Sequence, residues 1–229
     1  MKLVVLTGAG ISAESGIATF RDANGLWEGH DVMEVASPQG WEKNRELVLD
    51  FYNQRRQQAH LAKPNKGHLS LKKLEKDFEV SIVTQNVDNL HEQAGSKNVM
   101  HLHGELFKSQ STLDPSLIYD LKGSKLNVGD VCEKGSQLRP AIVWFGEAVP
   151  MMEVAIKETE NADIFLIVGT SLQVYPAAGL LNYTPENCDV YIVDPHQPAI
   201  ANNNNIHFIQ ENATTGVEKV AKLLKEKYC

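Results

Sequence analysis

Short, mostly apolar runs recur along the chain, and segments with a helical period separate several of them. The runs are Leu3–Thr7, Val80–Thr84, Ile164–Gly169, Val190–Val193 and Ile206–Ile209. Apolar runs of this kind are typical of strands that are buried on both faces of a parallel sheet. The helical patterns include Gly67–Lys76, Met152–Glu160 and an amphipathic segment over about Val217–Tyr228. This alternation predicts an α/β fold with a doubly wound, Rossmann-like parallel sheet.

Two stretches interrupt the alternation. Residues from about 26 to 65 have helical patterns without a strand signal, and residues from about 108 to 137 are polar and contain several glycines. We predict that both stretches form a smaller lobe, inserted into a large lobe made of roughly 1–25, 66–107 and 138–229. A chain of 229 residues is long enough for one such domain, 1–229.

The composition favours a folded globular protein and argues against a membrane protein or a nucleic-acid binder. A hydrophobic content of 42% favours a packed core, and a net charge of −7 argues against a dedicated nucleic-acid binder. No apolar run reaches transmembrane length and no secretory signal is recognisable, so we expect neither a membrane nor a nucleic acid as partner. The three cysteines, Cys132, Cys188 and Cys229, lie far apart in the sequence. That usage fits a reducing compartment, and we expect a cytoplasmic protein.

Polar or glycine clusters follow three of the predicted strands. They are Gly8-Ala9-Gly10, Gln85-Asn86-Val87-Asp88 and Gly169-Thr170-Ser171. In doubly wound sheets, ligands bind at the carboxyl ends of the strands, and a glycine turn before a helix suits a pyrophosphate. Gly-Ala-Gly is a weak signal by itself, because an ordinary strand-to-helix turn has the same residues and the spacing is not G-x-G-x-x-G. The three clusters together favour a binding site over ordinary loops.

The motifs taken together resemble the sirtuin family of NAD-dependent protein deacylases, and its desuccinylase- and demalonylase-type bacterial members in particular. The matching segments are Gly8–Ile17, Phe20-Arg21, Thr84–His91, His101–Glu105, Leu138–Pro140, Val143–Glu147 and Gly169–Ser171. The resemblance implies His103 and Asn86 as catalytic residues, with His103 as general base and His101 as the nearby competitor. It implies an NAD site formed by Gly8, Ala9, Gly10, Ser12, Phe20, Arg21, Gln85, Asn86, Asp88, Gly169, Thr170 and Ser171. Asp194 is a looser match to the usual ribose-binding asparagine.

The resemblance also implies a substrate site. Its residues would be the peptide-pairing segment Val143, Trp144, Phe145, Gly146 and Glu147, and the acyl-pocket residues Ala36, Tyr52 and Arg55. In the helical pattern Asn44–Ala62, Arg55 falls on an apolar stripe one turn after Tyr52. Taken alone, such an arginine indicates an internal salt bridge or a side chain that reaches water. The match to a Tyr-x-x-Arg signature indicates instead that Arg55 binds an acidic acyl group.

The function implied is NAD-dependent deacylation of protein lysine, with succinyl or malonyl groups removed and deacetylation expected alongside. The products would be nicotinamide, O-acyl-ADP-ribose and free lysine, and the partners would be acyl-lysine proteins or peptides. An NAD glycohydrolase, a mono-ADP-ribosyltransferase and a non-catalytic NAD-binding module remain as alternatives. The oligomeric state is open.

One departure from the family concerns its structural zinc. Most sirtuins hold zinc with two Cys-x-x-Cys pairs, whereas residues 105–137 contain one cysteine, Cys132, and no histidine. A tetrahedral site needs four ligands, so we predict no metal and no zinc in the smaller lobe. We expect apolar residues to hold this lobe together instead, namely Leu113, Leu117, Ile118, Tyr119 and Leu121.

Overall fold

A six-stranded parallel sheet forms the centre of the larger part of the molecule. The computed structural model describes residues 1–19, 26, 27, 29–121, 123, 125–198 and 205–229. The strands lie in the order β11-β10-β9-β1-β4-β5, so the chain winds outward from β1 in both directions. Their bounds are β1 Lys2–Thr7, β4 Glu79–Thr84, β5 Val99–His101, β9 Ile164–Val168, β10 Asp189–Val193 and β11 Ile206–Ile209. All five predicted strands are present. The three-residue β5 was not predicted, because it is too short to show a pattern.

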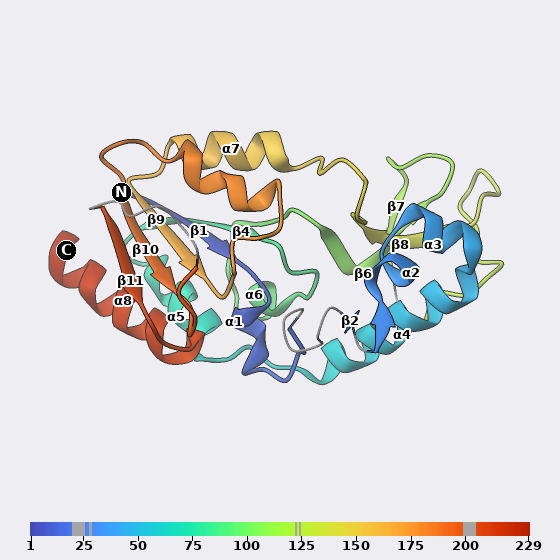
Figure 1. Cartoon of the computed structure of the whole chain (residues 1–229), viewed down its shortest axis with the longest axis horizontal. Helices are drawn as coiled ribbons and strands as arrows, with labels where there is room; N and C mark the ends of the chain where they lie inside the picture. The colour runs from blue at the N-terminus through green and yellow to red at the C-terminus, as the bar shows by residue number, and fades with distance from the viewer. Residues whose placement is uncertain (20–25, 28, 122, 124, 199–204) are drawn as a thin grey trace.

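Helices cover both faces of this sheet (Figure 1). Helices α5 (Lys66–Leu74) and α8 (Ala213–Tyr228) pack on one face, where Leu71, Val217 and Leu224 join its core. Helix α7 (Met152–Glu160) and the 3-10 helix η1 (Ala177–Tyr183) cover the other face. The predicted doubly wound α/β fold is therefore confirmed. No helix in the described part of the chain is long and apolar enough to cross a membrane.

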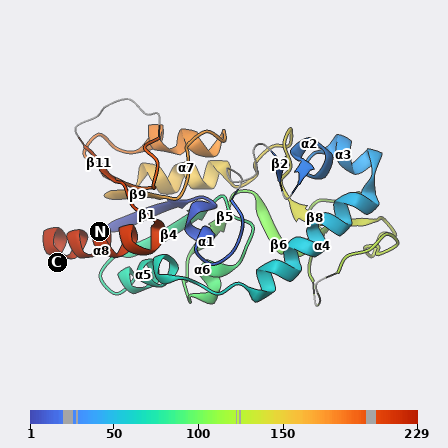
Figure 2. The same cartoon turned by 60° about the horizontal axis from the view of Figure 1, so that its bottom comes forward.

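A smaller unit with its own core lies beside the large sheet (Figure 2). It combines helices α2 (Val32–Val35), α3 (Pro38–Lys43) and α4 (Arg45–Leu61) with a three-stranded antiparallel sheet. That sheet has the order β7-β6-β8, with β6 Gly104–Ser111, β7 Ile118–Asp120 and β8 Leu138–Ile142. Strand β6 begins before residue 108 and β8 lies wholly after residue 137, so the sheet continues across the boundaries given above for the smaller lobe. The division into lobes stays a prediction.

Two expectations for the smaller unit are wrong in detail. The segment 26–65 contains a small hairpin of β2 (Leu26–Trp27) and β3 (His30–Asp31), although it showed no strand signal. Leu113 and Ile118 do not hold the unit together, because they are 65% and 53% exposed. Strand β7 lies at the edge of its sheet, and strand alternation turns Ile118 to solvent together with Asp120. The core is formed by Leu106, Leu126, Ile142 and residues of α2 and α4, and of the expected residues Leu121 packs against it.

Candidate active site

One cavity of about 1010 Å³ gathers the predicted site residues from both parts of the molecule. Residues after β1, β4, β9 and β10 line it from the large sheet, and residues of α4 and of the segment after β8 line it from the smaller unit. Phe20 and Arg21 lie outside the described residues. All other predicted site residues line this cavity: Gly8, Ala9, Gly10, Ser12, Ala36, Tyr52, Arg55, Gln85, Asn86, Asp88, His103, Val143, Trp144, Phe145, Gly146, Glu147, Gly169, Thr170, Ser171 and Asp194.

The first glycine loop packs directly on the loop after β9. The chain leaves β1 at Thr7 and enters the short helix α1 (Gly10–Ala13). The Gly8 amide donates to the Val168 carbonyl at 3.0 Å, and the Gly10 amide donates to the Gly169 carbonyl at 2.9 Å. A Cβ atom on Gly10 would lie 2.6 Å from the Gly169 Cα. The glycines are therefore needed for loop contact, and these two amides are bonded within the protein rather than directed to a phosphate.

A hydrogen-bonded group of three polar side chains lies beside this loop. The Asn86 Nδ2 donates to the Gly8 carbonyl and to the Ser12 Oγ, both at 3.2 Å. The Ser12 Oγ donates to the Asp88 Oδ2 at 3.0 Å, and the Leu90 amide donates to the Asp88 Oδ1 at 3.1 Å. Burial raises the pKa of Asp88, although these hydrogen bonds to its carboxylate oppose that shift. The group presents a hydroxyl, an amide and a carboxyl to the cavity.

His103 lies in the turn between β5 and β6 and is the histidine that suits a general base. Its Nδ1 lies 3.1 Å from the Gln85 carbonyl, which can only accept, so Nδ1 carries the proton and Nε2 keeps a lone pair. Burial lowers the pKa of His103 in spite of this hydrogen bond, and the ring is neutral at pH 7. The competitor His101 does not line the cavity, and it bonds to Glu92 and to the Asn86 carbonyl.

Tyr52 and Arg55 place a hydroxyl donor and a cation on one wall. Both lie on the same face of α4, are buried and line the cavity together with Ala36. The Trp144 Nε1 donates to the Tyr52 hydroxyl at 3.1 Å, which leaves the Tyr52 hydrogen for a second acceptor. Burial raises the pKa of Tyr52, so this group stays protonated. The Arg55 guanidinium lies 5.2 Å from the centre of the Trp27 ring.

The predicted peptide-pairing segment is held by an arginine that sequence reasoning did not place in the site. Arg139 donates to both carboxylate oxygens of Glu147, at 2.7 and 3.0 Å, and lies 3.5 Å over the Trp144 ring. Glu147 also accepts the Trp144 amide at 2.8 Å. The carboxylate of Glu147 is therefore bonded internally, and it stabilises the turn. The Leu138-Arg139-Pro140 motif was the available signal for Arg139.

Some cavity residues belong to none of the motifs. They are Ala18, Thr19, Trp27, Val149, Gln173, Val174, Tyr175, Pro176, Val193, Pro195, His196, Asn212 and Ala213, with Ala13, Glu14, Ile17, Val87 and Ile142 lying inside or beside motif segments. No sequence signal marks most of them. They line the cavity because the loops that carry them pass near the strand ends around it.

Cys132 is a buried residue of the smaller unit and has a hydrogen-bond partner there. Its side chain is buried, and its Sγ donates to the Ser111 Oγ at 3.3 Å. Within the described ranges, no group of three or more His, Cys, Asp or Glu side chains could hold a metal ion. The absence of zinc from the purified protein stays a prediction.

Comparison with known proteins gives the family. The family description "Sir2 family" matches residues 8–176. A curated relative from Bacteroides thetaiotaomicron, named NAD-dependent protein deacylase, is 54% identical over 227 residues, which is 97% of each chain. The chain belongs to the Sir2 family. A second relative with the same name, from Helicobacter pylori, is 53% identical over 224 residues, covering 98% of this chain and 97% of the relative.

Solved Sir2 structures have the same fold as this Sir2-family chain. A Sir2 homolog–NAD complex has a TM-score of 0.89 at 35% identity and covers 99% of this chain and 90% of its own. A structure of Sir2Tm bound to a propionylated peptide has a TM-score of 0.76 at 28% identity, covering 98% of this chain and 92% of its own.

Proposed function

We propose that this Sir2-family chain is an NAD-dependent protein-lysine deacylase that prefers succinyl and malonyl groups and also removes acetyl groups. One observation carries the proposal: a single cavity joins Asn86, Asp88 and His103 to Tyr52 and Arg55. The names of the relatives and the NAD-bound and peptide-bound Sir2 structures support it.

The residues present fit NAD as the co-substrate. A cavity of about 1010 Å³ is large for a small-molecule site and leaves room for a dinucleotide and a lysine side chain. Asp88, Ser12 and Asn86 offer polar atoms for ribose hydroxyls or a carboxamide. Asp194, which is buried and directly follows β10, fits the ribose-binding carboxylate of other dinucleotide folds. Contacts from Phe20 and Arg21 stay a prediction.

His103 has the protonation state that the reaction needs. When bound, NAD supplies the ADP-ribose that receives the acyl group as nicotinamide leaves. With NAD bound, the lone pair on Nε2 of His103 would take a proton from a ribose hydroxyl, because Nδ1 already donates to the Gln85 carbonyl. The walls formed by Trp144 and Ile142 are almost fully buried, and they keep water from the reacting groups.

The acidic acyl preference rests on Arg55 and Tyr52. A guanidinium and a hydroxyl donor on one buried wall can hold a carboxylate with charge-assisted hydrogen bonds. Such bonds contribute about 1.5–3 kcal/mol, which corresponds to roughly 10- to 150-fold in kcat/KM. Ala36, whose carbonyl accepts the Phe145 amide at 2.9 Å, adds no bulk to this wall.

The test compares succinyl- and acetyl-lysine peptides in the wild type and in Arg55→Met. We expect kcat/KM to fall roughly 10- to 150-fold for the succinyl peptide and by less than about threefold for the acetyl peptide. Arg45→Met is the matched control, because Arg45 is an exposed arginine at the start of the same helix and pairs with Glu42. An equal loss on both acyl groups in Arg55→Met would refute the carboxylate contact.

A further inference from the structure

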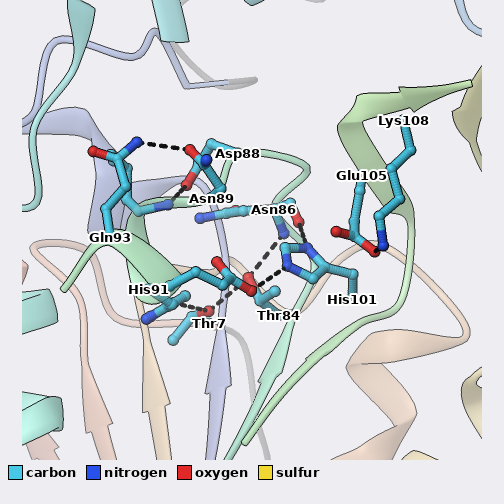
Figure 3. Close-up of polar contacts among 12 residues, drawn as sticks. Thr7, Thr84, Asn86, Asp88, Asn89, His91, Gln93, His101, Glu105 and Lys108 are labelled. Carbon is cyan, nitrogen blue, oxygen red and sulfur yellow. Dashed lines mark hydrogen bonds and ion pairs between the residues drawn. The ribbon is translucent and has the colours of Figure 1, made fainter. Parts of the chain in front are cut away.

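His101 lies behind the cavity wall and uses both of its ring nitrogens. Its Nδ1 is 2.8 Å from the Asn86 carbonyl oxygen (Figure 3). Its Nε2 is 2.9 Å from the Glu92 Oε1. The side chain is only 7% exposed. A backbone carbonyl and an ionised carboxylate can only accept hydrogen bonds. Both contacts are hydrogen bonds only if both nitrogens carry hydrogen, so the ring is an imidazolium.

The carbonyl that His101 holds belongs to the loop after β4, where no strand ladder fixes the backbone. The Asn86 amide donates to the Thr84 Oγ1 at 3.0 Å, and its side chain bonds to Gly8 and Ser12 as described above. With His101 at the carbonyl, the backbone and the side chain of Asn86 are held on three sides. His103 holds the preceding carbonyl, that of Gln85, in the same way. Consecutive carbonyls of the loop are thus each bound by one histidine.

We propose that His101, protonated and held by Glu92, is a positioning residue that fixes Asn86 in the active site. The proposal rests on the proposed deacylase function. Glu92 belongs to the short helix α6 (Leu90–Gln93), and His101 is the last residue of β5. The ion pair of Glu92 and His101 therefore connects α6 to β5, and His101 also contacts the loop after β4. A neutral ring keeps one hydrogen, and the charged Glu92 carboxylate is the stronger acceptor for it. Loss of the charge on His101 would therefore leave the hydrogen on Nε2, place the lone pair of Nδ1 against the Asn86 carbonyl and release Asn86.

The charges around His101 favour the protonated ring. Burial by itself lowers the pKa of His101, but the hydrogen bond and charge of Glu92, the Asn86 carbonyl and the charge of Glu105 outweigh it, and the pKa is raised. Lys108 pairs with Glu105 at 2.8 Å. Asp88 and His91 are the other titratable groups that interact with His101. Because the pKa is raised, the ring keeps its charge and the Asn86 contact to a higher pH than an ordinary histidine would, and the contact is lost as pH rises through the pKa of the folded state.

The first measurement is NMR of the full chain with ¹⁵N-labelled histidine, titrated from pH 6 to pH 9. We expect both ring nitrogens of His101 to be protonated at pH 7, where His103 is neutral. His101→Asn assigns the signal. A His101 ring that is neutral at pH 7 would overturn the proposal.

The second measurement is deacylation kinetics over the same pH range, with unfolding midpoints recorded for each variant. In His101→Asn we expect kcat to fall at least about tenfold, with the KM of the acyl peptide unchanged within about twofold. Glu92→Gln is the conservative variant, because a glutamine amide can donate to the Nε2 of a neutral His101 while Nδ1 still donates to Asn86. It should keep kcat near that of the wild type and abolish the loss of activity at high pH. Glu105→Gln is the control that removes a nearby charge without touching a contact of His101.

The outcomes separate the two proposals. His101→Asn with the kcat of the wild type, or the same alkaline loss of activity in Glu92→Gln as in the wild type, overturns the positioning role of His101. A wild-type protein without deacylase activity overturns the proposed function instead. In that case the NMR titration still decides the charge of His101, and the dissociation constant of NAD in His101→Asn replaces kcat as the readout. An unchanged constant then refutes the positioning role.

Discussion

Replacing Gly10 by alanine tests whether contact between the two glycine loops builds the NAD site. The new Cβ atom would lie 2.6 Å from the Gly169 Cα and 2.8 Å from the Gly169 carbonyl oxygen, whereas ordinary contacts begin at 3.4 Å. Both neighbours are backbone atoms, so the loops must separate and the Gly10–Gly169 hydrogen bond must lengthen. Overpacking of this kind costs about 1–3 kcal/mol. In a chain of this size the unfolding midpoint should fall by roughly 2–12 °C.

The assay measures the unfolding midpoint of Gly10→Ala with and without NAD, and the dissociation constant of NAD by calorimetry. We expect NAD binding to weaken at least about tenfold, because both displaced loops line the cavity. Gly179→Ala is the matched control, since its Cβ atom would lie no closer than 3.8 Å to the Tyr175 ring. Gly10→Ala with the stability and NAD affinity of the wild type would show that the loop contact is not needed.

Two further predictions concern the smaller unit. Metal analysis of the purified protein should find no zinc, because residues 105–137 supply one cysteine and no histidine, and one tightly bound zinc per chain would refute this. Glu147→Gln should lower the free energy of unfolding by about 1–3 kcal/mol at pH 7. Burial raises the pKa of Glu147, but the hydrogen bonds and charge of Arg139 outweigh it, and the pKa is lowered. The difference in unfolding free energy between variant and wild type should therefore shrink as pH falls below about 4.3, where Glu147 becomes protonated. A difference that is independent of pH in denaturant titrations would contradict the ion pair.

The parallel sheet and most of its strand ends were predictable, because buried strands appear as apolar runs and doubly wound sheets place ligands at one edge. The helix α4 was predictable from its apolar stripe. Val48, Phe51, Tyr52, Arg55 and Ala59 fall on one face of the pattern, and all are buried. The short strands β2, β3 and β5 were not predicted, because they have too few residues to show a hydrophobic period.

The partners of polar groups were not predictable from the sequence. The ion pair of Arg139 and Glu147 needs a turn that brings residues eight positions apart into bidentate contact. Arg56 is fully buried and donates to the Leu106 carbonyl and to Asn53, although its neighbour Arg55 showed the clearer signal. Such contacts depend on the path of the chain in space, which hydrophobic periodicity does not encode.

Mass spectrometry of the products formed from NAD and a succinyl-lysine peptide distinguishes the proposed deacylase from the alternative activities. A deacylase that transfers the acyl group should give nicotinamide, free lysine and O-succinyl-ADP-ribose in equal amounts, and His103→Ala should abolish them. ADP-ribose released without peptide would indicate an NAD glycohydrolase, and ADP-ribose attached to the peptide would indicate a mono-ADP-ribosyltransferase. Absence of any turnover on succinyl, malonyl and acetyl peptides would refute the proposed deacylation and leave an NAD-binding module.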